Sequence, residues 1–188
     1  LKWQLRTDGP IKSSAVIADG RVFVGSNDGH VYALDLSTGR RLWAFKTQDA
    51  VEAPPLSVGR SVFVGSSDGT FYALDAASGE LRWKHVTGDK ILAAAGWAAS
   101  PTDAGKTWIL VGSYDNNLHC LDADSGRVVW TFVSDNYINA TPAVADGKVI
   151  VGGCDDVVHV LDLAKCKPVT QVAVGAPIVA GGAVAGGK

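Results

Sequence analysis

The sequence predicts an all-β fold assembled from repeated four-stranded antiparallel units. One marker position recurs at Trp3, Trp43, Trp83, Trp130 and Thr170, with successive spacings of 40, 40, 47 and 40 residues. Each interval holds short apolar segments rich in Val, Ile, Phe and Tyr, separated by Asp-Gly, Asn-Asn or Thr-Gly turn signals, and helical periodicity is absent. Four antiparallel strands about every 40 residues is the spacing of β-propeller blades.

The first repeat shows how each strand is recognised. Its four predicted strands are residues 13–18 (SSAVIA), 21–26 (RVFVGS), 30–35 (HVYALD) and 40–47 (RRLWAFKT). The second strand is apolar on both alternating faces, which fits a sheet covered on both sides. The same sequence pattern recurs three more times. We therefore expect blades over residues 10–48, 49–88, 89–135 and 136–174, with the start of a further blade over 175–188.

The order of the strands predicts that these blades are part of a larger ring. The chain opens on a fourth-strand segment, LKWQLRTD, and stops after another first-strand segment, APIVAGGAVAGG. A closed ring of this kind needs roughly seven or eight blades. We therefore expect the uncovered blade faces to be met by the remaining blades of the same propeller or by a second copy of the chain.

Charge and hydropathy argue against two classes of partner. Lys and Arg number 17 against 19 Asp and Glu, so the net charge of −2 gives no electrostatic attraction for nucleic acid. No apolar run reaches the roughly 20 residues that a membrane-spanning helix needs. We expect neither nucleic-acid binding nor a membrane span.

The cysteines and histidines show no metal-binding pattern. Cys120, Cys154 and Cys166 include no CxxC pair and no zinc-type spacing to histidine, so we expect small packed thiols and no metal site. A disulfide between Cys154 and Cys166 stays open as an alternative. His119 and His159 occupy the position of Tyr32 and Tyr72 in other repeats, which favours third-strand packing over proton chemistry.

The repeated motif carries a family resemblance. The pattern Ala-x-Asp-x-x-[Thr/Ser]-Gly-x-x-x-Trp resembles the tryptophan-docking motif of the pyrroloquinoline-quinone (PQQ) type β-propeller repeat. We expect its residues to fix a turn and to dock neighbouring blades: Asp35, Gly39 and Trp43; Asp75, Gly79 and Trp83; Asp122, Gly126 and Trp130; and Asp162 of a degraded fourth copy. Asp28 and Asp68 are likewise interpreted as hairpin residues rather than calcium ligands.

We take as candidate binding residues those that depart from the repeat, because residues that recur in every blade are expected to maintain the fold. Lys12, Glu52 and Asn139 share one position at the mouth of the innermost strand and are predicted to converge there. Trp97 lies near a predicted loop in the third repeat, which carries an insertion. The hairpin positions and the connection before the fourth blade add five more candidates: Tyr114, Asn116, Tyr137, Cys154 and Asp155.

The resemblance leaves two functions open. We favour a non-catalytic propeller that binds proteins, peptides or another ligand in the bacterial cell envelope, with a periplasmic location implied by the family. The alternative is a PQQ- and calcium-dependent alcohol or sugar dehydrogenase, for which Glu52, Asn139 and Trp97 have suitable side chains. No adjacent cysteine pair is present, no cofactor is evident, and no catalytic residue is assigned.

Overall fold

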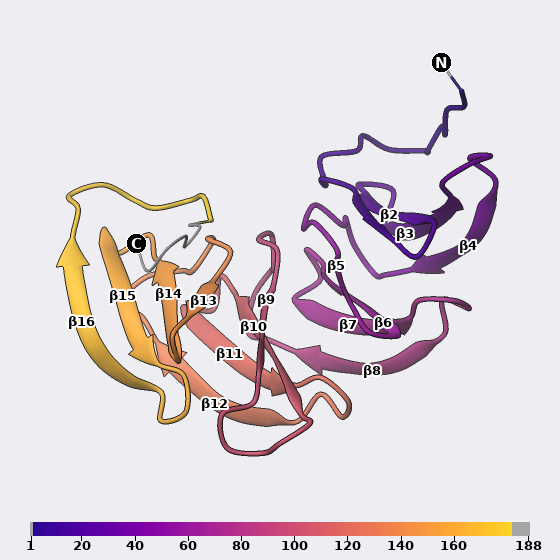
Figure 1. Ribbon diagram of the computed structural model, residues 1–188. Helices are drawn as coiled ribbons and strands as arrows, with labels where there is room; N and C mark the ends of the chain where they lie inside the picture. Colours follow the sequence, from indigo (N-terminus) through magenta and orange to yellow (C-terminus); the bar gives the residue numbers. More distant parts are fainter. Residues whose placement is uncertain (1, 182–188) are drawn as a thin grey trace. The chain divides into compact units, whose positions relative to one another are not determined.

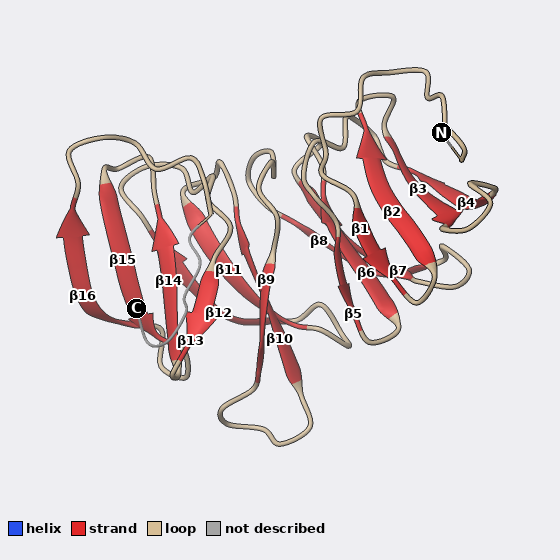
Figure 2. Cartoon of the chain, turned by 45° about the horizontal axis from the view of Figure 1, so that its top comes forward, coloured by secondary structure: helices blue, strands red, loops and turns tan. Residues whose placement is uncertain are grey.

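The computed structural model describes residues 2–181, which form strands, turns and loops. Figures 1 and 2 show these strands as four antiparallel sheets, each a meander in which neighbours along the chain pair. The all-β fold class, with four-stranded antiparallel blades, is confirmed. Among residues 2–181 no helix has the length and apolar character needed to cross a bilayer.

Each sheet falls within one predicted blade range. The first contains β1 (Val16–Ala18), β2 (Arg21–Ser26), β3 (His30–Asp35) and β4 (Arg41–Lys46). The second contains β5 (Leu56–Val58), β6 (Ser61–Gly65), β7 (Thr70–Asp75) and β8 (Leu81–Val86). The third contains β9 (Gly96–Ala99), β10 (Thr107–Gly112), β11 (Asn117–Asp122) and β12 (Val128–Val133). The fourth contains β13 (Ala143–Ala145), β14 (Lys148–Gly152), β15 (Val157–Asp162) and β16 (Lys167–Ala173).

The chain divides into two compact units, an N-terminal unit (Leu1–Leu92) and a C-terminal unit (Ala93–Lys188), with two blades in each. Within the N-terminal unit β1 lies against β5, and within the C-terminal unit β9 lies against β13. The first strands of neighbouring blades therefore approach one another, as the inner strands of a propeller do.

The second and third strands of each blade supply most of the core. All five residues of β6 are buried, as are five of the six residues of β7. The fourth strands are less buried. In β8 exposed residues largely alternate with partly buried ones, and every residue of β16 is exposed. Burial of both faces of the middle strands explains why their sequences lack the apolar and polar alternation of a half-exposed strand.

The turn between the third and fourth strands is held by its aspartate. Asp35 Oδ1 accepts hydrogen bonds from the backbone N–H of Ser37 at 3.0 Å and of Thr38 at 2.8 Å, and from both hydroxyl groups. These bonds, those from the Ser37 and Thr38 side chains first, lower the pKa of Asp35 to about 2. Gly39 closes the turn at φ +72°, where a side chain would be strained.

The marker tryptophans join neighbouring blades. Trp43 Nε1 donates a hydrogen bond to the Ala76 carbonyl oxygen in the next blade at 3.2 Å, and Trp130 Nε1 donates to the Leu163 carbonyl oxygen at 3.0 Å. Trp3 Nε1 does the same to the Leu36 carbonyl oxygen at 2.9 Å. One contact thus recurs at equivalent positions along the chain.

The third-blade insertion and the end of the chain can now be compared with the sequence expectation. The third-blade insertion forms the loop between β9 and β10, residues 100–106, while Trp97 itself lies in β9 because it pairs with Ile109. Residues 175–181 form no strand, and the first strands of the four blades begin 13 residues after the marker, which corresponds to residue 183 in the further blade. The remainder of the predicted further blade, residues 182–188, lies outside the described residues.

Candidate functional site

The meander gives every blade two distinct ends. The hairpin between the second and third strands lies at the same end as the connection to the next blade; we call this the connection end. The turns that join the first to the second strand and the third to the fourth strand lie at the opposite end, the turn end. The candidate residues are distributed over both ends.

In the N-terminal unit, Lys12 and Glu52 meet at the connection end. Lys12 Nζ lies 2.8 Å from Glu52 Oε1, and the same oxygen accepts a hydrogen bond from Asn27 Nδ2 at 2.9 Å. Lys12 is the main cause of the lowered pKa of Glu52, with burial acting in the other direction. Asn27 was not singled out in the sequence, although it stands at the hairpin position that holds Tyr114 in the third blade.

In the C-terminal unit, the hairpin position that holds Asn27 in the first blade is occupied by an aromatic residue, Tyr114. The rings of Tyr114 and Tyr137 stack with centroids 4.3 Å apart and an interplanar angle of 8°. Tyr114 comes from the β10–β11 hairpin and Tyr137 from the β12–β13 connection. Asn139, half-buried, follows two residues later in that connection, and Asn116 takes a positive φ of 70° at the tip of the hairpin.

Cys154 is built into the same cluster. Its backbone N–H donates to the Tyr137 carbonyl oxygen at 2.9 Å, and its own carbonyl oxygen accepts from Asn136 Nδ2 at 2.9 Å. A hydrogen bond with the Cys154 thiol raises the pKa of Tyr137. All three cysteines are free thiols. The disulfide between Cys154 and Cys166 does not form, because Cys154 lies at the connection end and Cys166 at the turn end.

The remaining candidate, Asp155, is part of the hairpin framework. Its Oδ2 lies 2.7 Å from His159 Nε2 and accepts a hydrogen bond from the Ser134 hydroxyl at 2.7 Å. The N-terminal blades have the same contact with tyrosine instead, because Tyr32 donates to Asp28 at 2.8 Å and Tyr72 to Asp68 at 2.8 Å. His159 is therefore a third-strand packing residue that replaces tyrosine.

A groove of about 600 Å³ lies at the turn end of the C-terminal unit. Trp97, which is 51% exposed, stands on β9 beside it. The lining comes from β9 and its loop and from the neighbouring blade: Trp97, Ala98, Ala99, Pro101, Val144, Ala145, Asp146, Gly147 and Leu163. Only Trp97 was picked out in the sequence, since Val144 and Leu163 belong to another repeat and match its ordinary pattern.

Each residue considered for PQQ and calcium can be placed within its own unit. The Glu52 carboxylate is engaged by Lys12 and Asn27. Trp97 borders the groove at the turn end, whereas Asn139 belongs to the connection end of the same unit. Residues 2–181 contain no group of three or more His, Cys, Asp or Glu side chains arranged to hold a metal ion.

Comparison with known proteins identifies the family. The family model described as outer membrane protein assembly factor BamB matches residues 1–107 and 92–169. The crystal structure of BamB from Moraxella catarrhalis matches with a TM-score of 0.76 and 26% identity, over 90% of this chain and 52% of that chain. The computationally designed Ika8 protein matches with a TM-score of 0.77 and 20% identity, over 88% of this chain and 50% of that chain, and shows the fold alone.

The chain thus spans about half the length of these two structures. None of the curated proteins matches the sequence. The family model covers most of the chain, including all four blades in whole or in part, and the BamB structure has the same repeated blades. The chain belongs to the outer membrane protein assembly factor BamB family of PQQ-like β-propeller repeat proteins.

Proposed function

We propose that this chain is part of a non-catalytic propeller scaffold that binds extended protein segments in the bacterial periplasm. Membership of a family described by outer membrane protein assembly supports both the location and the class of partner. The partners in this proposal are envelope proteins in an extended, incompletely folded form.

The observation that carries the proposal is the exposure of Trp97 beside the apolar groove. A tryptophan that is half exposed on a short strand keeps a large apolar surface in water, and tryptophan is among the residues that contribute most to protein interfaces. Its neighbours Ala99, Ala145 and Gly147 are small, so the groove stays open along the two blades.

The apolar lining of the groove, contributed by two blades, suits an extended segment. Pro101 and Trp97 form one wall, and Val144 and Leu163 come from the facing blade. Apolar side chains of an extended peptide can enter such a groove one after another, while the rigid blades keep the groove formed before binding.

Equilibrium binding to an unfolded outer-membrane protein segment tests this function. The probe is a fluorescently labelled peptide that corresponds to two transmembrane strands of such a protein, and the readout is fluorescence anisotropy with the full-length protein. We expect Trp97→Ser to weaken binding by at least about tenfold, as loss of an interface anchor does.

The matched control is Val133→Ser, which removes an apolar side chain that is 71% exposed on β12 of the same unit but does not line the groove. We expect its affinity to equal that of the wild type. Equal affinities for wild type and Trp97→Ser, or equal losses in both variants, would contradict the proposed function.

A further inference from the structure

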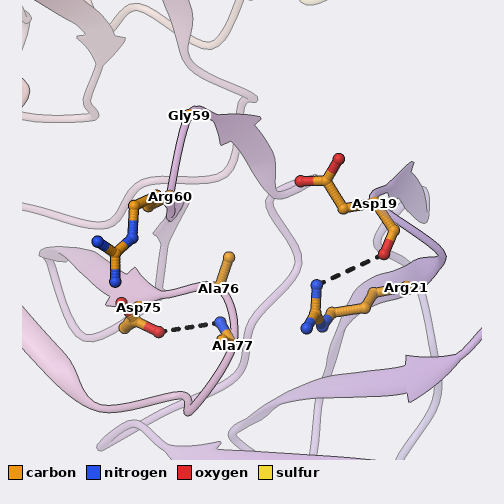
Figure 3. Close-up of a pocket in the computed structure, with 7 residues that line it drawn as sticks. All are labelled: Asp19, Arg21, Gly59, Arg60, Asp75, Ala76 and Ala77. Atoms are coloured by element: carbon orange, nitrogen blue, oxygen red, sulfur yellow. Dashed lines mark hydrogen bonds between the residues drawn. The ribbon is translucent and has the colours of Figure 1, made fainter.

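The N-terminal unit has a pocket at each end of its blades. At the turn end, a pocket of about 100 Å³ is lined by both blades, and Figure 3 shows Ala76 and Ala77 lying between the side chains of Arg21 and Arg60. The two guanidinium groups therefore do not converge on one ligand. At the connection end, a pocket of about 250 Å³ has an equivalent in the first blade that is filled by a lysine of the protein itself.

The connection-end pocket is built from two segments of the second blade. The β6–β7 hairpin contributes residues 67–69, and the connection after β8 contributes residues 87–90. Gly69, at the tip of the hairpin, has a φ of +77°, and a Cβ at this residue would lie 3.2 Å from the Asp89 carbonyl oxygen. The absence of a side chain at residue 69 therefore leaves room between the two segments.

In the first blade, an ammonium group occupies the equivalent place. Lys46 lies opposite His30 in the β3–β4 pair, and its Nζ donates a hydrogen bond to the Asp28 carbonyl oxygen of the hairpin. The same Nζ lies 2.9 Å from the position that a Cβ on Gly29 would take. The first blade thus shows which chemical group this part of a blade accommodates.

The other blades differ from the first at this place. In the second blade Val86 stands at the position of Lys46, opposite Thr70, and has no donor for the hairpin carbonyl group. In the third and fourth blades Asn116 and Asp156 replace the hairpin glycine, so a side chain begins beside the place that the ammonium takes in the first blade. Among residues 2–181, the second blade alone combines the hairpin glycine with an apolar residue in place of the lysine.

The pocket offers oxygen acceptors to a donor. The Asp68 carbonyl oxygen is the counterpart of the Asp28 carbonyl oxygen, and within residues 2–181 no N–H or O–H group donates to it. The exposed carboxylate of Asp89 accepts the Lys90 backbone N–H through Oδ1 at 2.6 Å, and a carboxylate has capacity for further donors. A carbonyl oxygen and a carboxylate together suit a charged N–H donor.

The charge of the lining is compatible with a cation. Asp68 and Asp89 line the pocket together with one lysine, Lys90. Lys12 most, and Lys90 to a smaller extent, lower the pKa of Glu52, so the charge of Lys90 also acts on a carboxylate outside the pocket. The lining therefore carries more negative than positive charge.

We propose that the pocket at the connection end of the second blade binds a primary ammonium group carried on a methylene chain. An ammonium group has three N–H donors, which can be shared between the Asp68 carbonyl oxygen and the Asp89 carboxylate. A volume of about 250 Å³ exceeds that of a few waters and so admits the adjoining methylene groups as well. The group is the side chain of a lysine in a partner polypeptide or the end of a free linear amine.

Titration with Nα-acetyl-lysine amide, followed by amide NMR shifts of the full-length protein, tests the site. We expect saturable shifts at residues 67–69 and at Gly88. The Nε-acetylated form of the same compound, which lacks the charge, should give none. Asp89→Asn should weaken binding by about two- to fivefold, as loss of an exposed ion pair does. Asp49→Asn, at the equivalent position of the first blade, is the control and should retain wild-type affinity.

A lysine placed at residue 86 should block the pocket. Val86 is 65% exposed, so Val86→Lys leaves the fold intact, and its tethered ammonium should weaken binding of the free probe by about tenfold. Val133→Lys adds the same charge at the equivalent, exposed position of the third blade and should have no effect. Conversely, Lys46→Val should create a second set of saturable shifts, at Gly29 and Asp49.

Cadaverine, a free linear diamine, identifies the source of the group. Tighter binding of Nα-acetyl-lysine amide than of cadaverine supports a partner lysine, and equal or tighter binding of cadaverine supports a free amine. The proposal would be overturned by the absence of saturable shifts with both probes, by equal shifts from the Nε-acetylated compound or from calcium chloride alone, or by equal weakening in Val86→Lys and Val133→Lys. None of these outcomes depends on the Trp97 groove, which lies in the other unit.

Discussion

The indole of Trp43 lies so close to Gly79 of the next blade that a Cβ at residue 79 would come 2.6 Å from the ring. Gly79 also has φ +76°, so Gly79→Ala introduces both a collision and backbone strain. We expect this variant to lose about 2–5 kcal/mol of unfolding free energy, measured by urea denaturation.

Gly59→Ala separates these two effects. Gly59 has φ +58°, but no atom lies within 4 Å of the position that its Cβ would take. This variant should lose only the strain, about 1–2 kcal/mol. Equal losses at residues 59 and 79 would mean that contact with Trp43 does not determine the requirement for glycine.

Asp35 makes the stability of the first blade depend on pH. Its pKa in the folded protein, about 2, lies below the ordinary value of 3.8, so its contribution is present above pH 3.8 and is lost as the pH falls toward 2. Asp35→Asn should therefore be less stable than the wild type at pH 7, with the difference narrowing between pH 4 and 2. Urea midpoints over this range measure it.

The control for this prediction is Asp19→Asn. Asp19 is an exposed turn residue at φ 48°, a conformation that asparagine adopts readily. Its urea midpoint should follow that of the wild type across the same pH range. A gap between wild type and Asp35→Asn that stays constant from pH 7 to pH 2 would rule out this role of the carboxylate.

The stacked pair Tyr114 and Tyr137 should show energetic coupling. Parallel rings 4.3 Å apart are expected to contribute about 0.5–1.5 kcal/mol beyond the burial of their area. A double-mutant cycle with Tyr114→Ala and Tyr137→Ala, followed by urea denaturation, measures this term. Strictly additive losses would show that the two rings do not support one another.

Truncation of two tryptophans of the third blade should affect the unfolding free energy to very different extents. Trp108 is 4% exposed, so Trp108→Ala should cost about 3–5 kcal/mol of unfolding free energy. Trp97 is 51% exposed, and Trp97→Ala should stay within about 0.5 kcal/mol of the wild type. A large loss of stability in Trp97→Ala would indicate that this side chain serves the fold rather than a partner.

The strands and their turns could be predicted because their determinants are local. Asp35 bonds to residues two and three positions away, and Asp28 bonds to His30 and Tyr32. Such contacts repeat with the sequence, so a pattern of turn residues is sufficient to place the strands. Repetition also predicts the meeting of Lys12 and Glu52, because equal positions in successive blades are neighbours in space.

The groove beside Trp97 could not be predicted in this way. Trp97 lines the groove together with Val144 and Leu163, across the boundary between blades. Whether such a boundary leaves an opening depends on the volumes of side chains from two repeats, which no single repeat reveals. Trp97 was the visible signal for the groove, and its meaning depends on Val144 and Leu163, which belong to another repeat.

Photo-crosslinking in living cells tests the proposed scaffold function most directly. A photoreactive phenylalanine derivative is placed at residue 97 of the full-length protein, and at residue 133, which is also exposed, as the control. The account predicts a discrete crosslinked product from residue 97, identified by mass spectrometry as a segment of an outer-membrane protein, and none from residue 133. No product from residue 97, or the same products from both positions, would contradict it.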